Sequence, residues 1–423
     1  VIHPFAEHIA YYALFSIPGL TTILTGTGSI ISFAGYITYV DSMNNMGHCN
    51  FELIPNWFRT NYSLFMPIYD YIYGTLDKNS NTLYENSVKR NEESPNVVHL
   101  THLTTPESIY HLRLGFAYLA SKPYSSVWYL WLLWPVTLWF MVLTKIYRRT
   151  FVVERNRFDQ IRLQTWAIPT YRGQYCLKRQ KESINNMIEE AVLEAEEKGA
   201  SALSLGLMNQ ASFSASSHNQ YGEVYVKKHP QLKVKLVDGS SLAVAVLLNS
   251  IPKGTTQVLL RGNLTKVAFA VTFALCQKGI QDEYEKLDKS FGTKSEDNFS
   301  KSYSSCKVWL VGDDFTEEEQ RKATEGTLFI PFSQFPPKKL RKDCFYHTTP
   351  AMQTPMALEN VDSCENWLPR RVMSVWRIAG ILHALEGWEE HECGYTMCNI
   401  DKVWEACLKH GFQPLRVPIQ SKS

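Results

Sequence analysis

The longest apolar stretch of the chain lies near its start and predicts a membrane-embedded hairpin. The 32 residues from Ile9 to Val40 include no charged side chain, whereas a helix of about 20 residues already crosses the hydrocarbon core. Pro18 and Gly19 interrupt the stretch, and further glycines follow. This pattern favours two short helices that fold back on each other over one long tilted helix.

Histidines flank this stretch on both sides, with His3 and His8 before it and His48 after it. A hairpin returns both of its ends to the same side of the membrane, which would bring the three imidazoles to one surface. Because imidazole is the commonest metal ligand in proteins, the pattern indicates a membrane-bound metal site formed by these residues. The alternative is that the histidines anchor helix ends at the membrane–water boundary or hydrogen-bond a carbonyl group.

A second apolar stretch, Val127–Thr144, contains four tryptophans and no charge. Basic residues follow at once, Arg148 and Arg149 among them. By the positive-inside rule, we expect this end of the stretch, and everything after Arg149, to lie in the cytosol. Pro135 would kink a spanning helix, so a re-entrant or surface-parallel helix is the alternative.

The pattern of polar and apolar residues changes after the second apolar stretch. An amphipathic helix is predicted from Ser183 to Glu197, and short apolar runs then alternate with helical patterns. The runs predicted to be strands are Ala202–Leu207, Val224–Lys227, Lys233–Val237, Val258–Leu260, Val308–Val311 and Thr327–Ile330. The predicted helices are Val267–Gln277, Glu317–Ala323, Arg371–Glu386 and Val403–His410, and Ser240–Leu248 fits either state. This alternation predicts an α/β domain with a largely parallel sheet.

These patterns divide the chain into three parts, since 423 residues exceed one compact core. We expect a membrane-embedded domain at residues 1–149, a basic aromatic linker at 150–182 and a cytosolic α/β domain at 183–423. Within the first part, Val97–Leu103 is predicted to be extended. Its His99 and His102 are expected to occupy solvated or core-edge positions.

Charge and cysteine content exclude several classes of protein. A net charge of +2 gives no electrostatic basis for binding nucleic acid. The nine cysteines include no Cys-x-x-Cys pair, which excludes zinc ribbons and thioredoxin motifs of the usual spacing. Their irregular distribution is typical of reduced thiols facing the cytosol.

Two further patterns suggest chemistry in the α/β domain. The turn Gly262–Lys266 lies between a predicted strand and helix, where a phosphate loop would stand, but it lacks both nucleotide-binding glycine patterns. We therefore expect interaction or lipid handling there, with nucleotide binding as the alternative. Cys364, His383 and His391 lie in one region, although no motif joins them into a catalytic triad, and structural roles are the simpler interpretation.

Seven runs of residues, spread over nearly the whole chain, form specific motifs: His3–His8, Asn44–Glu52, Phe58–Pro67, Val98–Ser108, Leu203–Gln210, Gly326–Pro336 and Gly380–Glu389. They resemble the eceriferum/glossy family of plant cuticular wax synthesis. More narrowly, they are similar to the very-long-chain aldehyde decarbonylases of that family.

The resemblance implies an α-helical membrane domain of fatty-acid-hydroxylase type, followed by a soluble α/β Rossmann-like domain. It implies an iron-dependent enzyme of the endoplasmic reticulum membrane that converts a very-long-chain aldehyde to an alkane one carbon shorter. A sister eceriferum protein would supply the aldehyde, and cytochrome b5 would donate electrons. Of the family's di-iron ligands, His3, His8 and His48 have counterparts here.

The chain departs from the family pattern in its histidine boxes. It opens on Val1 without a methionine, and we expect an upstream portion to carry the first boxes. A later box belongs between Pro55 and Phe58, where only Asn56 and Trp57 stand. Two hypotheses follow: an active aldehyde decarbonylase, or a catalytically inactive or truncated relative that binds partners in the wax-synthesis complex.

Overall fold

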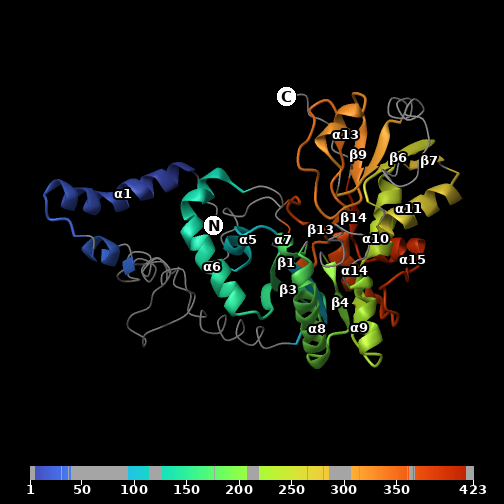
Figure 1. The fold of residues 1–423 in the computed structure, drawn as a ribbon, viewed down its shortest axis with the longest axis horizontal. Helices are drawn as coiled ribbons and strands as arrows, with labels where there is room; N and C mark the ends of the chain where they lie inside the picture. The colour runs from blue at the N-terminus through green and yellow to red at the C-terminus, as the bar shows by residue number, and fades with distance from the viewer. Residues whose placement is uncertain are drawn as a thin grey trace, which may run out of the picture. The chain divides into compact units, whose positions relative to one another are not determined.

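The chain forms two compact units, Val1–Glu93 and Ser94–Ser423. The computed structural model describes residues 5–29, 31–36, 38–39, 94–113, 126–175, 177–206, 219–263, 265–279, 281–284, 306–313, 315–359, 361, 365 and 367–415. Figure 1 shows the described elements of both units.

The first unit contains two helical segments that fold back on each other. Helix α1 (Phe5–Leu24) runs through Pro18 without interruption, and a second helical segment spans residues 31–36. A Cβ atom on Gly19 would lie 2.7 Å from the ring of Phe33, so the second segment packs closely onto α1 at this glycine. The structure thus has the predicted hairpin, but its bend follows the end of α1 instead of Pro18.

A six-stranded sheet forms the first lobe of the second unit, in the order β12-β2-β3-β1-β4-β5. Strands β3 (Ile161–Tyr171), β1 (Val97–Leu103), β4 (Ala202–Ser204) and β5 (Lys235–Val237) are parallel, and β2 (Phe151–Phe158) and β12 (Leu358–Glu359) add antiparallel pairs at one edge. Counted along the chain, the parallel strands have the order 2-1-3-4, which is the order of a flavodoxin-like doubly wound sheet.

A five-stranded parallel sheet forms the second lobe, in the order β10-β9-β8-β6-β7. Its strands are β6 (Gln257–Arg261), β7 (Gln281–Tyr284), β8 (Val308–Val311), β9 (Leu328–Pro331) and β10 (Phe345–Tyr346). Their order along the chain is 2-1-3-4-5, again doubly wound. The α/β character predicted from the sequence is confirmed, with two parallel sheets where the pattern predicted one.

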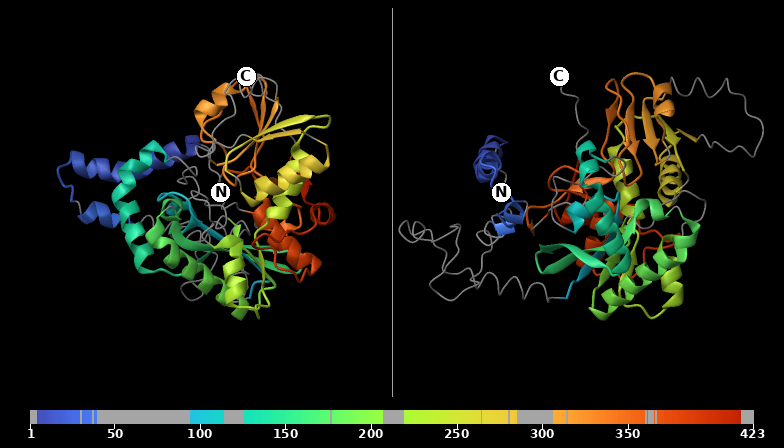
Figure 2. Two further views of the ribbon diagram at one scale, coloured as in Figure 1. Left: turned by 45° about the vertical axis from the view of Figure 1, so that its right-hand side comes forward. Right: turned by 60° about the vertical axis from the view of Figure 1, so that its left-hand side comes forward.

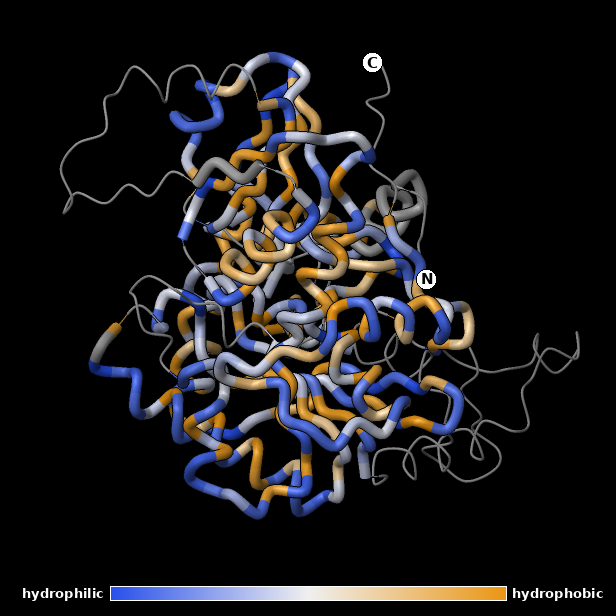
Figure 3. The backbone as a smooth tube through the Cα atoms, turned by 90° about the vertical axis from the view of Figure 1, so that its right-hand side faces the viewer, coloured by the Kyte–Doolittle hydropathy of each residue, from blue (hydrophilic) through white to orange (hydrophobic). Residues whose placement is uncertain are grey.

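Helices cover both faces of the first sheet, as Figure 2 shows from two sides. On one face α8 (Lys181–Glu197) and α9 (Glu223–Lys228) pack over alternate strand residues such as Val98 and Leu203. On the other face α10 (Ser240–Ser250) and α14 (Val375–Glu386) belong to a hydrophobic cluster that also includes Leu260 of the second lobe. One continuous core therefore joins the two lobes. Figure 3, which colours each residue by its hydropathy, shows segments of hydrophobic residues inside both lobes.

The C-terminal residues return to the first lobe. Helix α15 (Ile400–Lys409) packs against α10 and α14. A three-stranded antiparallel sheet has the order β13-β11-β14, and its strands are Val372–Ser374, Ala351–Gln353 and Gln413–Pro414. The remaining described elements are α5 (Ser108–Leu112), η2 (Trp128–Leu133), α6 (Trp134–Ile146), α7 (Arg172–Tyr175), η3 (Lys178–Gln180), η5 (Gln220–Gly222), α11 (Lys266–Gln277) and α13 (Glu317–Lys322).

One stretch of the described residues, Trp128–Ile146, is helical and apolar enough to cross a membrane. It joins η2 to α6, and only 17% of its most apolar window is buried. Trp128 and Trp131 are 82% and 79% exposed. Pro135 stands in the first turn of α6, where a missing N–H group costs no hydrogen bond, so it starts the helix instead of kinking it.

The first lobe crosses the domain boundary predicted after residue 149. Strand β1 comes from the predicted membrane domain, and β2 and β3 come from the predicted linker at 150–182, yet both parts pair within one sheet. The division between the compact units lies at residues 93 and 94 instead. The apolar helix α6 caused the difference, because it interrupts the connection between β1 and β2.

The predicted strand at Val224–Lys227 is wrong, since these residues lie in α9. Tyr225 is fully buried against α8 in the core of the first lobe. Packing of this ring on a helical face outweighs the β-propensity of the two neighbouring valines, which is a weak and context-dependent preference.

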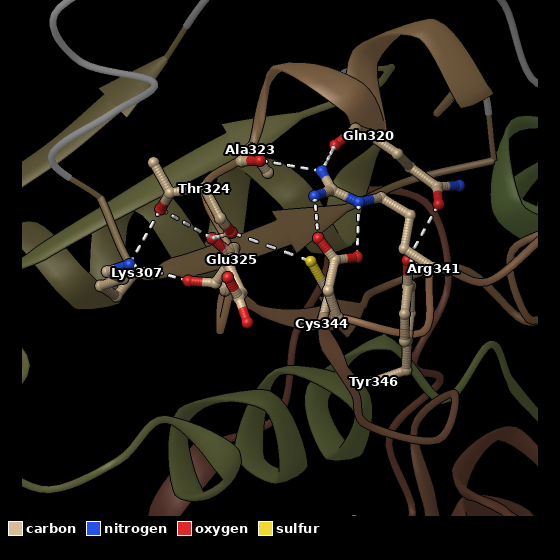
Figure 4. Close-up of polar contacts among 10 residues, drawn as sticks. Lys307, Gln320, Ala323, Thr324, Glu325, Arg341, Cys344 and Tyr346 are labelled. Carbon is tan, nitrogen blue, oxygen red and sulfur yellow. Dashed lines mark hydrogen bonds and ion pairs between the residues drawn. The ribbon is translucent and has the colours of Figure 1, made fainter.

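Helix α13 of the second lobe is capped at both ends. Thr316 and Glu319 form a capping box at its start. At its other end the guanidinium group of Arg341 donates hydrogen bonds to the carbonyl oxygens of Gln320 and Ala323, the latter at 2.8 Å, as Figure 4 shows. The Gln320 carbonyl oxygen also accepts the Ala323 backbone N–H, so Arg341 adds a side-chain cap to the last turn of the helix and stabilises the fold.

Candidate functional site

The three histidines predicted to bind metal fall on parts of the chain about which the structure says little. His8 lies within α1, and only its backbone is described. His3 and His48 lie outside the described residues. Metal binding by these three residues therefore stays a prediction.

His99 and His102 lie on the central strand β1 and are buried, 4% and 2% exposed, so the solvated or core-edge position expected for them is wrong. The His99 Nδ1 atom lies 3.2 Å from the Ser204 hydroxyl oxygen. The His102 ring packs 4.8 Å from the ring of Tyr175. Burial, and to a lesser degree the charge of Arg172, lowers the pKa of His102 to about 3, so both the position and the charge state of this residue are those of a core group.

The carboxyl ends of the two parallel sheets meet at the interface between the lobes. Gln334, after β9, donates a buried hydrogen bond of 3.1 Å to the carbonyl oxygen of Gly206, after β4. In the second lobe Gly262 follows β6 and Gly312 follows β8, the two strands between which the strand order reverses. Ligands of doubly wound folds bind at such a switch point.

The two glycines leave little space between them. Gly262 has a φ of 118°, and a Cβ atom there would lie 2.9 Å from the backbone of Gly312. Glycine at this position is therefore required by the close approach of two chain segments. No phosphate need be invoked to explain it.

Lys266, the lysine of the turn considered as a phosphate loop, is engaged within the protein. Its Nζ atom donates to the Asp238 carboxylate and to the Thr396 carbonyl oxygen, each at 2.6 Å, and its side chain is only 3% exposed. The turn therefore joins the second lobe to the end of β5 in the first lobe, and its lysine is committed to that contact.

Next to this ion pair lies a compact group of three side chains, each of a type that can bind a metal ion. The His383 Nε2 atom is 3.4 Å from the Glu392 carboxylate and 3.8 Å from the Cys398 sulfur atom. One donor atom from each residue lies within 4.8 Å of the other two, and among the described residues this is the one such group. His383 is on α14, Glu392 pairs beside β5 and Cys398 precedes α15, so three elements converge here.

The fold holds these side chains in place through Ser241, at the start of α10. Its backbone N–H donates to the second oxygen of the Glu392 carboxylate at 2.7 Å, and its hydroxyl group accepts from the Cys398 backbone N–H at 2.9 Å. The ring of Trp388 packs edge-on against the imidazole of His383, with centroids 5.0 Å apart. The arrangement is thus fixed by groups around it.

Burial and charge act in opposite directions on the acids of this region. Burial raises the pKa of Asp238, although the nearby charge of Lys266 opposes the shift. Burial alone would also raise the pKa of Glu392, but the hydrogen bond and charge of His383, together with Lys266, lower it below its usual value. Burial raises the pKa of the Cys398 thiol to about 12. Without a cation beside it, this thiol is neutral at physiological pH.

Comparison with known proteins identifies the family. Residues 258–414 match the family model of the CER1-like C-terminal domain. The chain is 58% identical to the very-long-chain aldehyde decarbonylase CER1 of Arabidopsis thaliana, covering 99% of this chain and 72% of that protein. It is 55% identical to the very-long-chain aldehyde decarbonylase GL1-5 of Oryza sativa subsp. indica, with 98% and 72% covered. The chain belongs to the CER1/GL1 family.

The family model matches a defined part of the structure. It begins within β6 and ends in β14, so it covers the second lobe, the three-stranded sheet, α14 and α15. Lys266, His383, Glu392 and Cys398 all lie within it, whereas Asp238 precedes it. The CER1/GL1 relatives extend the match to the first lobe and to the first unit.

Cys364, His383 and His391 lie in one region of the sequence, but the described residues of this set do not form one site. Cys364 lies outside the described residues. His391 accepts a hydrogen bond of 3.1 Å from the Leu236 backbone at the sheet edge. Of the two residues that the structure describes, His383 belongs to the cluster and His391 does not. Glu392 and Cys398 were missed because they stand in the connection between α14 and α15, where no motif spacing indicates which side chains turn inward.

Proposed function

We propose that this chain takes part in converting very-long-chain fatty aldehydes to alkanes in cuticular wax biosynthesis. The observation that carries the proposal is the 58% identity over 99% of the chain to a relative named as a very-long-chain aldehyde decarbonylase. Further relatives from Oryza sativa with the same activity in their names are 50–55% identical.

The distribution of apolar surface supports a membrane-bound enzyme. A very-long-chain aldehyde is itself lipid-soluble, so an enzyme acting on it gains from residing in the bilayer that holds the substrate. The exposed apolar helix α6 and the helical hairpin of the first unit supply two elements suited to lipid contact. We place the protein in the endoplasmic reticulum membrane, with the α/β lobes in the cytosol.

Iron is the proposed metal of the reaction, with His3, His8 and His48 among its ligands. Imidazole nitrogen is a donor that iron accepts. Three imidazoles are nevertheless too few for a two-iron centre, which in helical di-iron proteins takes about six protein ligands. These three residues alone would therefore not hold a full two-iron centre.

The proposed partners follow the family. A sister eceriferum protein would deliver the aldehyde, cytochrome b5 would donate electrons, and membrane lipid would surround α6. Delivery by a membrane-bound partner suits a substrate that is nearly insoluble in water.

A second candidate function rests on the missing histidine box between Pro55 and Phe58. The alignment with the Arabidopsis relative spans 454 positions, more than the 423 residues of this chain, so that relative has residues within the aligned region that this chain lacks. A catalytically inactive member of the wax-synthesis complex would retain the α/β lobes as a partner-binding module and would make no alkane.

Alkane formation in yeast separates the two functions. The chain is expressed with the sister protein, cytochrome b5 and a source of very-long-chain acyl-CoA, and alkanes are quantified by gas chromatography. Activity predicts odd-chain alkanes, and His48→Ala should lower their yield by about 100-fold if His48 is a ligand, since even outer-shell changes at metal sites cost 10–100-fold.

The matched control is His229→Ala, which removes an imidazole paired with Glu189 on the surface of the first lobe. It should leave the alkane yield unchanged. Absence of alkane with the unmodified chain, under conditions in which CER1 produces it, would favour the inactive member. Alkane output that persists in His48→Ala would remove His48 from the ligand set.

A further inference from the structure

The group His383, Glu392 and Cys398 has the dimensions of a zinc site. A tetrahedral zinc ion with Zn–N and Zn–O distances of about 2.1 Å and a Zn–S distance of about 2.3 Å separates its ligand atoms by about 3.3–3.6 Å. The N···O separation here is 3.4 Å and the N···S separation is 3.8 Å. The third separation, between the Glu392 oxygen and the Cys398 sulfur, is within 4.8 Å, so the side chains must draw together to place all three donors on one ion.

Glu392 and Cys398 compete for one nitrogen atom of His383. Glu392 and Cys398 both approach the same atom, His383 Nε2, which carries at most one hydrogen. If that hydrogen points to Glu392, the Cys398 thiol has no acceptor at the imidazole. If the thiol donates instead, the carboxylate faces the imidazole lone pair. A cation at the centre accepts a lone pair from all three groups at once.

We propose that His383, Glu392 and Cys398 bind one zinc ion, a site distinct from the iron site of the proposed reaction. Imidazole, carboxylate and thiolate are all zinc ligands, and the thiolate disfavours magnesium and calcium. Ser241 positions Glu392 and the backbone at Cys398, as the groups around metal ligands commonly do. Cys398 is only partly buried, which gives the ion a route of entry.

The zinc ion would tie three elements of the first lobe together. It would link the last turns of α14 to the segment paired with β5 and to the start of α15. Three protein ligands leave a fourth position for water. The Cys398 thiol would be bound as thiolate, since zinc displaces its proton.

The first test needs no variant. The full chain, purified in detergent with zinc, is treated with iodoacetamide before and after chelation, and alkylation is read residue by residue by mass spectrometry. Zinc binding predicts that Cys398 is alkylated at least tenfold faster after chelation. Cys276, an exposed thiol on α11, should react equally in both samples and serves as the internal control.

The second test measures metal directly. Elemental analysis should find about one zinc per chain, lost in His383→Gln and in Cys398→Ser and retained in Cys276→Ser. Cobalt added to the metal-free chain should give a thiolate-to-cobalt charge-transfer band that Cys398→Ser lacks. Chelator-independent alkylation of Cys398, or a chain without zinc and without the cobalt band, would overturn the proposal.

Discussion

Lys266 and Asp238 show how much the fold depends on a single buried contact. Their side chains are 3% and 0% exposed, and the pair joins the start of α11 in the second lobe to the end of β5 in the first. The Lys266 ammonium group donates to the Asp238 carboxylate and to the Thr396 carbonyl oxygen, so removing the lysine leaves a buried carboxylate without its cation.

We therefore predict that Lys266→Met lowers the free energy of unfolding by about 3–5 kcal/mol, because breaking a buried ion pair from one side strands the other charge. Thermal and denaturant unfolding of the full chain in detergent would measure it. The matched control is Lys227→Met, which breaks an exposed pair with Glu223 and should cost at most about 1 kcal/mol. Equal effects of the two changes would contradict the prediction.

His102 predicts a specific pH dependence of stability. Its pKa is about 3 in the folded chain, against 6.5 for an exposed imidazole. Between these values the unfolded chain binds a proton that the folded chain does not. Stability from this group is therefore complete above pH 6.5 and declines as the pH falls toward 3, by at most about 1.4 kcal/mol per pH unit. His102→Gln should make the acid side of the stability profile shallower, and a profile of unchanged slope would count against the assignment.

At the scale of elements, η2 and α6 differ from every other described helix in exposing a row of tryptophans. Trp128, Trp131 and Trp139 are 82%, 79% and 61% exposed, while Tyr110 hydrogen-bonds Thr137 on the opposite side of α6 at 2.7 Å. One face thus belongs to the α/β unit and the other is suited to lipid, since tryptophan favours the headgroup level of a membrane.

We predict that lipids brominated along the acyl chain quench tryptophan fluorescence of the chain in vesicles. The quenched fraction should fall when Trp128, Trp131 and Trp139 are replaced together by Phe. Replacing Trp309 by Phe is the control, because this residue of β8 is fully buried in the second lobe and its loss should not lower the quenched fraction. Equal quenching in the triple variant would show that α6 stays out of the bilayer.

At the scale of the whole molecule, hydrophobic patterning predicted the α/β class because strands buried on both faces read as short apolar runs. Val258–Leu260 and Val308–Val311 are two such runs, and they lie in the neighbouring parallel strands β6 and β8. Runs of this kind identify single strands, but they do not show which strands pair. The sequence pattern therefore predicted one parallel sheet where the chain forms two.

The division into domains could not be predicted from the same patterns. The apolar stretch at Trp128–Ile146 separates β1 from β2 along the chain, although the two strands belong to one sheet. Hydropathy reports where lipid contact is favourable, and it carries no information on which strands pair across an insertion. The pairing depends on tertiary contacts, so the boundary predicted after residue 149 fell inside the first lobe.

The cluster around His383 could be predicted only in part, because two of its three residues lie outside any regular sequence pattern. His383 stands on a predicted helix, whereas Glu392 and Cys398 lie in a connection without periodicity. Their convergence depends on Ser241, which stands 151 and 157 residues earlier in the chain and holds both through its backbone and hydroxyl groups. Contacts between residues so far apart in the chain produce no local sequence pattern from which they could be predicted.

The return of α14, α15 and β14 to the first lobe has a consequence for synthesis of the protein. Strand β1 emerges from the ribosome early, yet α14 and α15, which help to cover one face of its sheet, are made only at residues 375–409, and Gln413–Pro414 completes a sheet with β11. During synthesis, one apolar face of the first sheet therefore stays partly exposed until these residues have been translated. Late nonsense alleles should accordingly behave as nulls, cleared by quality control, and chaperone supply should limit how much of this protein a cell can accumulate.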